Sequence, residues 1–339
     1  MFKFPSHAIA NIIALSERFP WAMPLFGFCS GLASFLLVER KQGLAQIIAL
    51  MILASWCWFL TEKVVHRITQ RWFGLSSPRP LAVYATQLMH QESLFFVIPF
   101  LFLTTAWNSG QSVYTAILLV AAAITIIDPL YFRWLAPRRV WYFAFHGITL
   151  FAVLQTILPI IFYLPTAQSY CWSLGIALLL IAVGIASGTQ WRWWKRMLVI
   201  VGLVSALGYT GLVVRPWIPP STLWLTDVAI ASAINGAEKI PKNNLKVLSD
   251  AELHKGLYAY TAIHAPRGLR ERIYHEWKLN GKLIDRVPLD IHGGREAGYR
   301  AWSHKVNFPA DSTGRWQIRV VTEADQLIGV LRFKVVPDS

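Results

Sequence analysis

Several ionisable residues lie within or beside long apolar stretches of the chain. Asp128, His146 and Glu92 are the candidates, and Glu62 and His90 lie at a depth similar to that of Glu92, near span ends. Such side chains are costly in the core of a lipid bilayer, and they often mark proton relays or polar sites. Asp128 and His146 fall on two apolar runs joined by a basic turn, so they could face each other. The simpler interpretation, which the sequence favours, pairs Asp128 with Arg133 at the membrane surface and gives His146 a hydrogen bond within the helices.

A second set of residues lies in the more polar C-terminal third: His275, Arg300, Trp302 and His304. If their strands lie near one another, these residues form a candidate site for a sugar or an anion. Trp302 would stack on the ligand and Arg300 would form bidentate hydrogen bonds. The simpler alternative, which we favour, is an ordinary strand surface with one buried aromatic residue.

Catalytic and metal-binding patterns are missing from the sequence. It contains no His-Glu-x-x-His, no Gly-x-Ser-x-Gly and no Gly-x-x-x-x-Gly-Lys motif. The histidines of the C-terminal third have no short ligand spacing and no cysteine partner, so we expect no metal site. No catalytic residue and no cofactor is predicted. The sequence favours a non-enzymatic protein and leaves an enzyme open.

The composition indicates a membrane protein. Hydrophobic residues make up 55% of the chain and charged residues 15%, with a mean hydropathy of +0.43. The net charge of +14 at first suggests nucleic-acid binding. However, 15 of the 32 lysines and arginines precede residue 222, against five acidic residues, and most of them lie in short loops between apolar runs. Positive charge in such loops sets membrane topology, so we expect the bilayer and no nucleic acid as partner.

About seven apolar runs are long enough to span a bilayer, and they end before Arg215–Pro220. The count is uncertain by about one, because the third run is short and Leu81–His90 before it has the character of an amphipathic or re-entrant segment. We therefore expect a polytopic helical domain over 1–215. The expected spans lie near 20–38, 44–62, 93–107, 113–134, 140–164, 170–187 and 197–214.

The basic residues also predict the orientation of these spans. One side of the membrane would collect 12 of them, and the other side only Arg40, Lys41 and Arg215. By the positive-inside rule, the N-terminus is cytoplasmic. An odd number of spans then places the C-terminal domain outside the cytoplasm. We expect a multi-pass protein of the bacterial inner membrane with a periplasmic domain.

The segment 216–255 is expected to connect the two parts through short helical pieces. Leu223–Ile234 has the mixed composition of a short helix on the membrane surface. Ser249 and Glu252 have the spacing of a capping box, which predicts a helix start.

From residue 256 to 339 the pattern is typical of an all-β, Ig-like antiparallel sandwich. Asn280-Gly281 is a strong hairpin signal, because both residues tolerate positive φ. Alternation places Ile273, His275 and Trp277 on one face, which is the expected core. The six expected strands cover 257–265, 271–279, 282–291, 299–308, 314–322 and 327–336.

Several short motifs in this last third are similar to those of an uncharacterised bacterial domain family. They include Tyr274-His275-Glu276-Trp277, Gly298-Tyr299-Arg300-Ala301-Trp302-Ser303 and Gly314-Arg315-Trp316-Gln317. That family commonly sits at the C-terminus of multi-span inner-membrane proteins. The resemblance implies a small extracytoplasmic β-domain without an established activity, so it carries over no functional residue.

Two functions follow from these patterns. The first is a non-enzymatic inner-membrane protein whose periplasmic β-sandwich binds an envelope glycan or another envelope protein, as the mild positive charge of that part suits a polyanionic partner. The second is a transporter or lipid-handling membrane enzyme that uses polar residues of the helical bundle, with the β-domain as an accessory.

Overall fold

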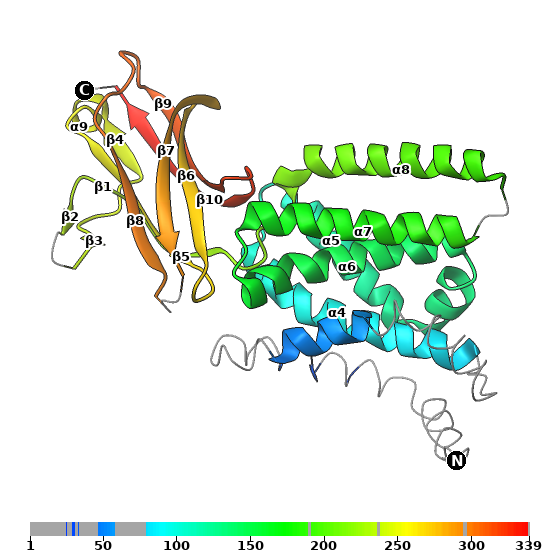
Figure 1. The fold of residues 1–339 in the computed structure, drawn as a ribbon. Coiled ribbons are helices and arrows are strands. Elements are labelled where there is room, and N and C mark those ends of the chain that lie inside the picture. The colour runs from blue at the N-terminus through cyan, green and yellow to red at the C-terminus, as the bar shows by residue number, and fades with distance from the viewer. Residues whose placement is uncertain are drawn as a thin grey trace. The chain divides into compact units, whose positions relative to one another are not determined.

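The computed structural model describes residues 47–57, 79–188, 191–235, 238–293 and 297–337, together with positions 25, 29, 30 and 33. A helical region is followed along the chain by a β-rich domain (Figure 1). The residues form two compact units. The first unit contains residues 1–99, 117–153 and 179–200; the second contains residues 100–116, 154–178 and 201–339. Each unit is considered by itself below.

Apolar helices make up the first part of the chain, as the composition predicts. Three of them, α6, α7 and α8, are long and apolar enough to cross a membrane. A fourth span follows if α5 and η1 count as one, although they are bent by 97° at Asp128-Pro129. The helices are α4 (Arg79–Thr104), α5 (Gln111–Ile126), the π-helix η1 (Pro129–Leu135), α6 (Arg139–Phe162), α7 (Thr166–Gly188) and α8 (Trp193–Val213).

The described residues therefore do not support seven membrane-spanning helices. The expected run 20–38 lies outside them apart from four single positions, and 44–62 overlaps a shorter apolar helix, Ile47–Cys57. The expected short span 93–107 and the segment Leu81–His90 before it belong to one continuous 26-residue helix, α4. Polar residues in the middle of α4 reduce its hydropathy. They are Gln87, His90, Gln91, Glu92 and Ser93.

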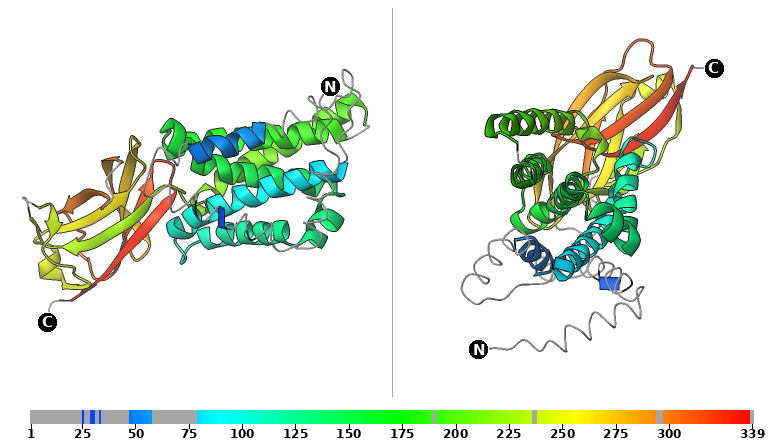
Figure 2. Two further views of the ribbon diagram at one scale, coloured as in Figure 1. Left: turned by 90° about the horizontal axis from the view of Figure 1, so that it is seen from below. Right: turned by 90° about the vertical axis from the view of Figure 1, so that its right-hand side faces the viewer.

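The β-rich domain contains all six expected strands, coloured yellow to red in Figure 2. Asn280 and Gly281 form the expected hairpin turn, with φ of 49° and 88°. The strands are β5 (Leu257–His264), β6 (Arg270–Leu279), β7 (Lys282–His292), β8 (Tyr299–Lys305), β9 (Gly314–Thr322) and β10 (Leu327–Val336).

The connector differs in part from the expectation. Leu223–Ile234 is not a surface helix: it contains strand β1 (Trp224–Ala231), which pairs with β5 along nearly its whole length. Backbone pairing with a long neighbouring strand outweighs the weak helical preference of such a short segment. The capping box is confirmed: Ser249 and Glu252 bond each other's backbone N–H at the start of α9 (Asp250–Leu253). The other short pieces are η2 (Arg215–Trp217), β2 (Ile234–Asn235), β3 (Ile240–Pro241) and β4 (Val247–Ser249).

Two sheets share one buried core. The first has the order β1-β5-β8, and the second has the order β4-β10-β9-β6-β7. The core contains Ala259 and Ile263 from the first sheet and Ile273, Trp277 and Trp316 from the second. The expectation of purely antiparallel pairing is wrong at one edge, because β4 runs parallel to β10. The two strands are far apart in the sequence, so no hairpin turn sets their relative direction.

Candidate functional site

The outer face of the three-stranded sheet carries three of the four residues predicted to bind a ligand. Arg300, Trp302 and His304 alternate along β8, so they point to the same side. The His304 ring stacks on Tyr258 of β5, with ring centroids 4.0 Å apart and planes 10° from parallel. A partly exposed aromatic surface beside an arginine is thus built on regular strands.

Part of this outer face is covered by the chain itself. Trp302 lies opposite Tyr260 in the strand register and packs, half-buried, against a small cluster that also includes Ile234. Arg300 donates from Nη1 to the backbone carbonyl of Glu238 at 2.6 Å. His304 is exposed. The surface open to a ligand therefore lies toward the Tyr258–His304 end of β8.

His275 does not belong to this face. It is fully buried between the sheets, where its Nδ1 lies 2.9 Å from Ser303 Oγ and its Nε2 lies 3.2 Å from Thr261 Oγ1. Burial lowers the pKa of His275 to about 3, so the ring is neutral at ordinary pH. Strand alternation therefore separates His275 from the other three predicted residues. Ser303, which bonds His275, points inward, whereas its neighbours Trp302 and His304 point outward.

The bonds around His275 form one consistent chain. Trp277 Nε1 donates to Ser303 Oγ at 3.1 Å, which leaves the Ser303 hydroxyl to donate to His275 Nδ1. His275 Nε2–H then donates to Thr261, whose hydroxyl donates onward to the carbonyl of Ala301. Every polar atom of the ring is paired, so His275 is a structural residue of the core.

A second stacked pair lies at the other end of the same face and was missed from the sequence. The rings of Trp224 and His264 are parallel to within 15°, with centroids 3.8 Å apart. Burial lowers the pKa of His264 to about 4. Alternation along β5 places His264 in phase with Tyr258, and this spacing is the signal that could have found it.

In the helical unit, Asp128 and His146 bond different partners, and only the partner of His146 is of the expected kind. Asp128 accepts a hydrogen bond from Gln87 Nε2 at 2.8 Å, and no ion pair with Arg133 occurs among the described residues. His146 is fully buried, and its Nδ1 lies 2.6 Å from the Tyr142 carbonyl, as the simpler interpretation expects. Glu92 is exposed on α4.

His90 is the central residue of this polar region. Its ring meets that of His146 edge-on, with centroids 4.4 Å apart, and its Nδ1 lies 2.9 Å from the hydroxyl of Tyr131. Gln87 and Gln91, on the same face of α4, both donate to the backbone carbonyl of Thr125. The spacing of Gln87, His90 and Gln91 by three and four residues is the sequence signal for this shared face.

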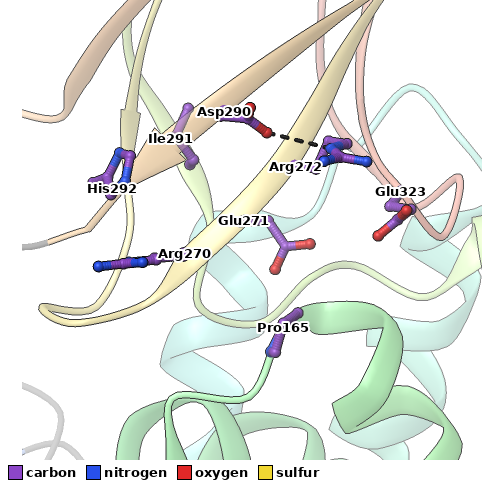
Figure 3. Close-up of a pocket in the computed structure, with 8 residues that line it drawn as sticks. All are labelled: Pro165, Arg270, Glu271, Arg272, Asp290, Ile291, His292 and Glu323. Atoms are coloured by element: carbon purple, nitrogen blue, oxygen red, sulfur yellow. Dashed lines mark hydrogen bonds and ion pairs between the residues drawn. The ribbon is translucent and has the colours of Figure 1, made fainter.

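A pocket of about 430 Å³ opens in the second unit, beside the beginning of α7 (Figure 3). Its most buried ionisable group is the carboxylate of Glu271, which is 4% exposed. This carboxylate accepts from both the backbone N–H and the hydroxyl of Thr166, at 2.7 and 2.8 Å. Thr166 is the first residue of α7, so Glu271 caps that helix from β6. The lining residues are Pro165, Arg270, Glu271, Arg272, Asp290, Ile291, His292 and Glu323.

Burial raises the pKa of Glu271 to about 7, even though the two hydrogen bonds from Thr166 oppose that rise. The negative charge of Glu323 raises the pKa further, and the positive charge of Arg215 lowers it. Sequence inspection did not identify Glu271. Its signal is that it shares the core-facing phase of β6 with Ile273 and His275, where a carboxylate is unusual.

The fold places the chain among helical proteins with several apolar helices and a C-terminal β-rich domain. Comparison with known families gives a more particular result. Residues 2–259 match the model described as a family of unknown function (DUF5924), and residues 270–335 match a protein of unknown function (DUF2914). The first match covers more than half of the chain, so the chain belongs to the DUF5924 family. No curated protein and no solved structure matches it.

Replacing Glu271 with Gln should flatten the pH dependence of stability. The folded protein binds the Glu271 proton more tightly than the unfolded chain does, so the wild type loses stability as pH rises from about 4.5 to about 7. The loss is at most about 3.5 kcal/mol, at about 1.4 kcal/mol per pKa unit. Gln keeps both contacts, because its carbonyl can accept from the Thr166 N–H and its amide can donate to the hydroxyl. The measurement is the thermal midpoint of the full chain in detergent, followed by tryptophan fluorescence between pH 5 and 8.

The matched control is Glu323→Gln, which removes an exposed carboxylate of the same pocket and should retain most of the slope. Parallel curves for the wild type and Glu271→Gln would show that Glu271 does not titrate in this range.

Proposed function

We propose that this chain is a membrane-anchored, non-enzymatic binding protein that recognises an envelope glycan with the outer face of its β1-β5-β8 sheet. The observation that carries the proposal is the row of Arg300, Trp302 and His304, with Tyr258 stacked on His304. Aromatic rings bind the apolar faces of sugars, and a guanidinium binds hydroxyl or acidic groups in a fixed geometry. Strands hold these side chains more rigidly than loops would.

We further propose that the β-rich domain lies in the periplasm, beside a bacterial inner membrane, and that its two sheets form an Ig-like sandwich. Two features support the location. The short loop between α7 and α8 is followed by basic residues, whereas the loop between α6 and α7 carries no charge, which favours a cytoplasmic position for the former. Tyr170 of α7 donates to the Gly211 carbonyl of α8, so the two helices run antiparallel and the β-rich domain follows on the uncharged side.

A reporter fused after Ser339 tests this location. Green fluorescent protein at that position should be dark, because it does not mature when exported through the membrane unfolded, and alkaline phosphatase there should be active. The same two reporters fused after Arg192, between α7 and α8, serve as the control and should give the opposite pattern. Bright fluorescence at Ser339 would place the β-rich domain in the cytoplasm.

Replacing Trp302 or Arg300 with Ala should weaken glycan binding. Loss of one stacking contact costs about 0.5–1.5 kcal/mol, which corresponds to a roughly two- to tenfold weaker affinity. The measurement is binding of soluble peptidoglycan glycan strands to the full chain in detergent micelles, by isothermal titration calorimetry. The control is Arg332→Ala, an exposed arginine on β10 of the other sheet. Equal affinities in all four proteins would remove the outer face as the binding site.

A second candidate function rests on a separate observation, the buried polar cluster of the helical unit. His90 contacts both His146 and Tyr131, all three without exposure to solvent, and Gln87, on the same face of α4, bonds Asp128. Such a cluster inside apolar helices supports a transporter or lipid-handling enzyme that uses proton movement.

Under this second function, His90→Gln and His146→Gln should each abolish proton movement into proteoliposomes. The measurement is quenching of a pH-sensitive dye in vesicles that contain the purified protein and carry an imposed potassium diffusion potential. Glu92→Gln is the control, because Glu92 is exposed and should leave the flux unchanged. If wild-type vesicles show no more proton flux than empty vesicles, the second function is rejected and only the first function remains.

A further inference from the structure

The pocket beside α7 carries positive charge at one end and negative charge at the other. Arg272 and Asp290 face each other across the β6–β7 ladder and form an ion pair at 3.3 Å, so they largely neutralise each other. Arg270 is paired with His292 in the same ladder, which puts both side chains at one end of the pocket. The backbone N–H of Glu323 bonds the Arg272 carbonyl, which holds Glu323 at the other end. Figure 3 shows Arg270 and His292 on one side, Glu323 on the other and Glu271 between them.

This arrangement selects against simple ions. An anion near Arg270 would be attracted there but repelled by the carboxylate of Glu323 if it filled the pocket. A cation near Glu323 would be attracted there but repelled by the guanidinium of Arg270. A molecule with both charges satisfies the two ends at once, with its anionic group at Arg270 and its ammonium group at Glu323. The volume of about 430 Å³ lies within the range of about 300–1,000 Å³ that is usual for small-molecule pockets.

The position of the pocket narrows the choice of molecule. Glu271, in the pocket wall, bonds the first residue of α7, which is long and apolar enough to cross a membrane. Tyr163, at the end of α6, and Trp217, after α8, expose 40% and 54% of their surfaces at the same helix ends. Exposed Tyr and Trp residues at the ends of membrane helices mark the head-group zone of a bilayer. Lipid head groups are therefore the zwitterions with ready access to the pocket.

The geometry points to a phospholipid-binding site: the pocket takes a phosphoethanolamine head group, with the phosphate at Arg270 and the ammonium at Glu323. Arginine suits the phosphate because its planar fork of N–H donors matches two phosphate oxygens. A primary ammonium donates hydrogen bonds to a carboxylate, whereas the trimethylammonium of choline cannot. The site is distinct from the outer face of the other sheet, and neither proposal depends on the other.

Native mass spectrometry of the delipidated full chain in detergent tests this inference. The probes are dioleoyl phosphatidylethanolamine, phosphatidylglycerol and phosphatidylcholine, each added alone at the same concentration. We expect the ethanolamine lipid to be retained at least fivefold more than either of the others. Soluble phosphoethanolamine at millimolar concentration should displace it.

Arg270→Ala and Glu323→Gln should each remove that preference. Both residues are exposed, so both variants should still fold, and Arg332→Ala serves as the matched control that keeps the preference. Three results would overturn the inference. These are equal retention of phosphatidylglycerol, an unchanged preference in both pocket variants, and binding of soluble phosphoethanolamine without retention of the lipid. The last result would assign the pocket to a soluble zwitterion instead.

Discussion

The second unit depends on the contact between the Glu271 carboxylate and the first residue of α7. A helix begins with backbone N–H groups that have no partner within the helix, and in an apolar setting each one left unpaired costs free energy. Glu271 satisfies one of these groups and the Thr166 hydroxyl with a single buried side chain. Gln111 Nε2 bonds the Leu327 carbonyl, and Gln326 Nε2 bonds the Ile218 carbonyl. Buried polar contacts therefore connect β-strand ends to helix ends in this unit.

The same requirement explains two buried networks that differ in kind. Inside the β-rich domain, the His275 ring has a donor or acceptor opposite each nitrogen, and its surroundings keep it neutral. In the helical unit, glutamines of α4 bond a backbone carbonyl at Thr125, near the end of α5 and before the bend at Pro129. Pro129 provides no N–H there, and the π-helix that follows shifts the backbone bonding pattern. The polar side chains of α4 thus bind backbone at a point where regular helical bonding is interrupted.

The amount of fold that the sequence predicts depends on how local its determinants are. The strands β5 to β10 follow from period-two alternation and from turn residues such as Asn280-Gly281, which act over a few positions. Strand β1 and the parallel pairing of β4 with β10 depend on partners that are distant in the sequence, so local composition suggested a helix for the former and antiparallel order for the latter. In the helices, hydropathy predicted α6, α7 and α8 with bounds close to those observed, and it failed for α4, where polar residues occupy one face.

The candidate sites also differ in whether local sequence or long-range contacts determine them. Arg300, Trp302 and His304 could be grouped from spacing alone, because residues two apart on a strand share a face. Whether His275 joins them depends on which side of its own sheet meets the other sheet, and its phase with Ile273 and Trp277 already assigned it to the core. Glu271 shares that phase, yet it lies at the strand end where the core gives way to helix ends, so it is buried against Thr166 instead of against the other sheet. A charged residue in a core-facing position at a strand end therefore indicates a polar contact with another element. At such positions, the pattern of a single strand gives information about long-range contacts.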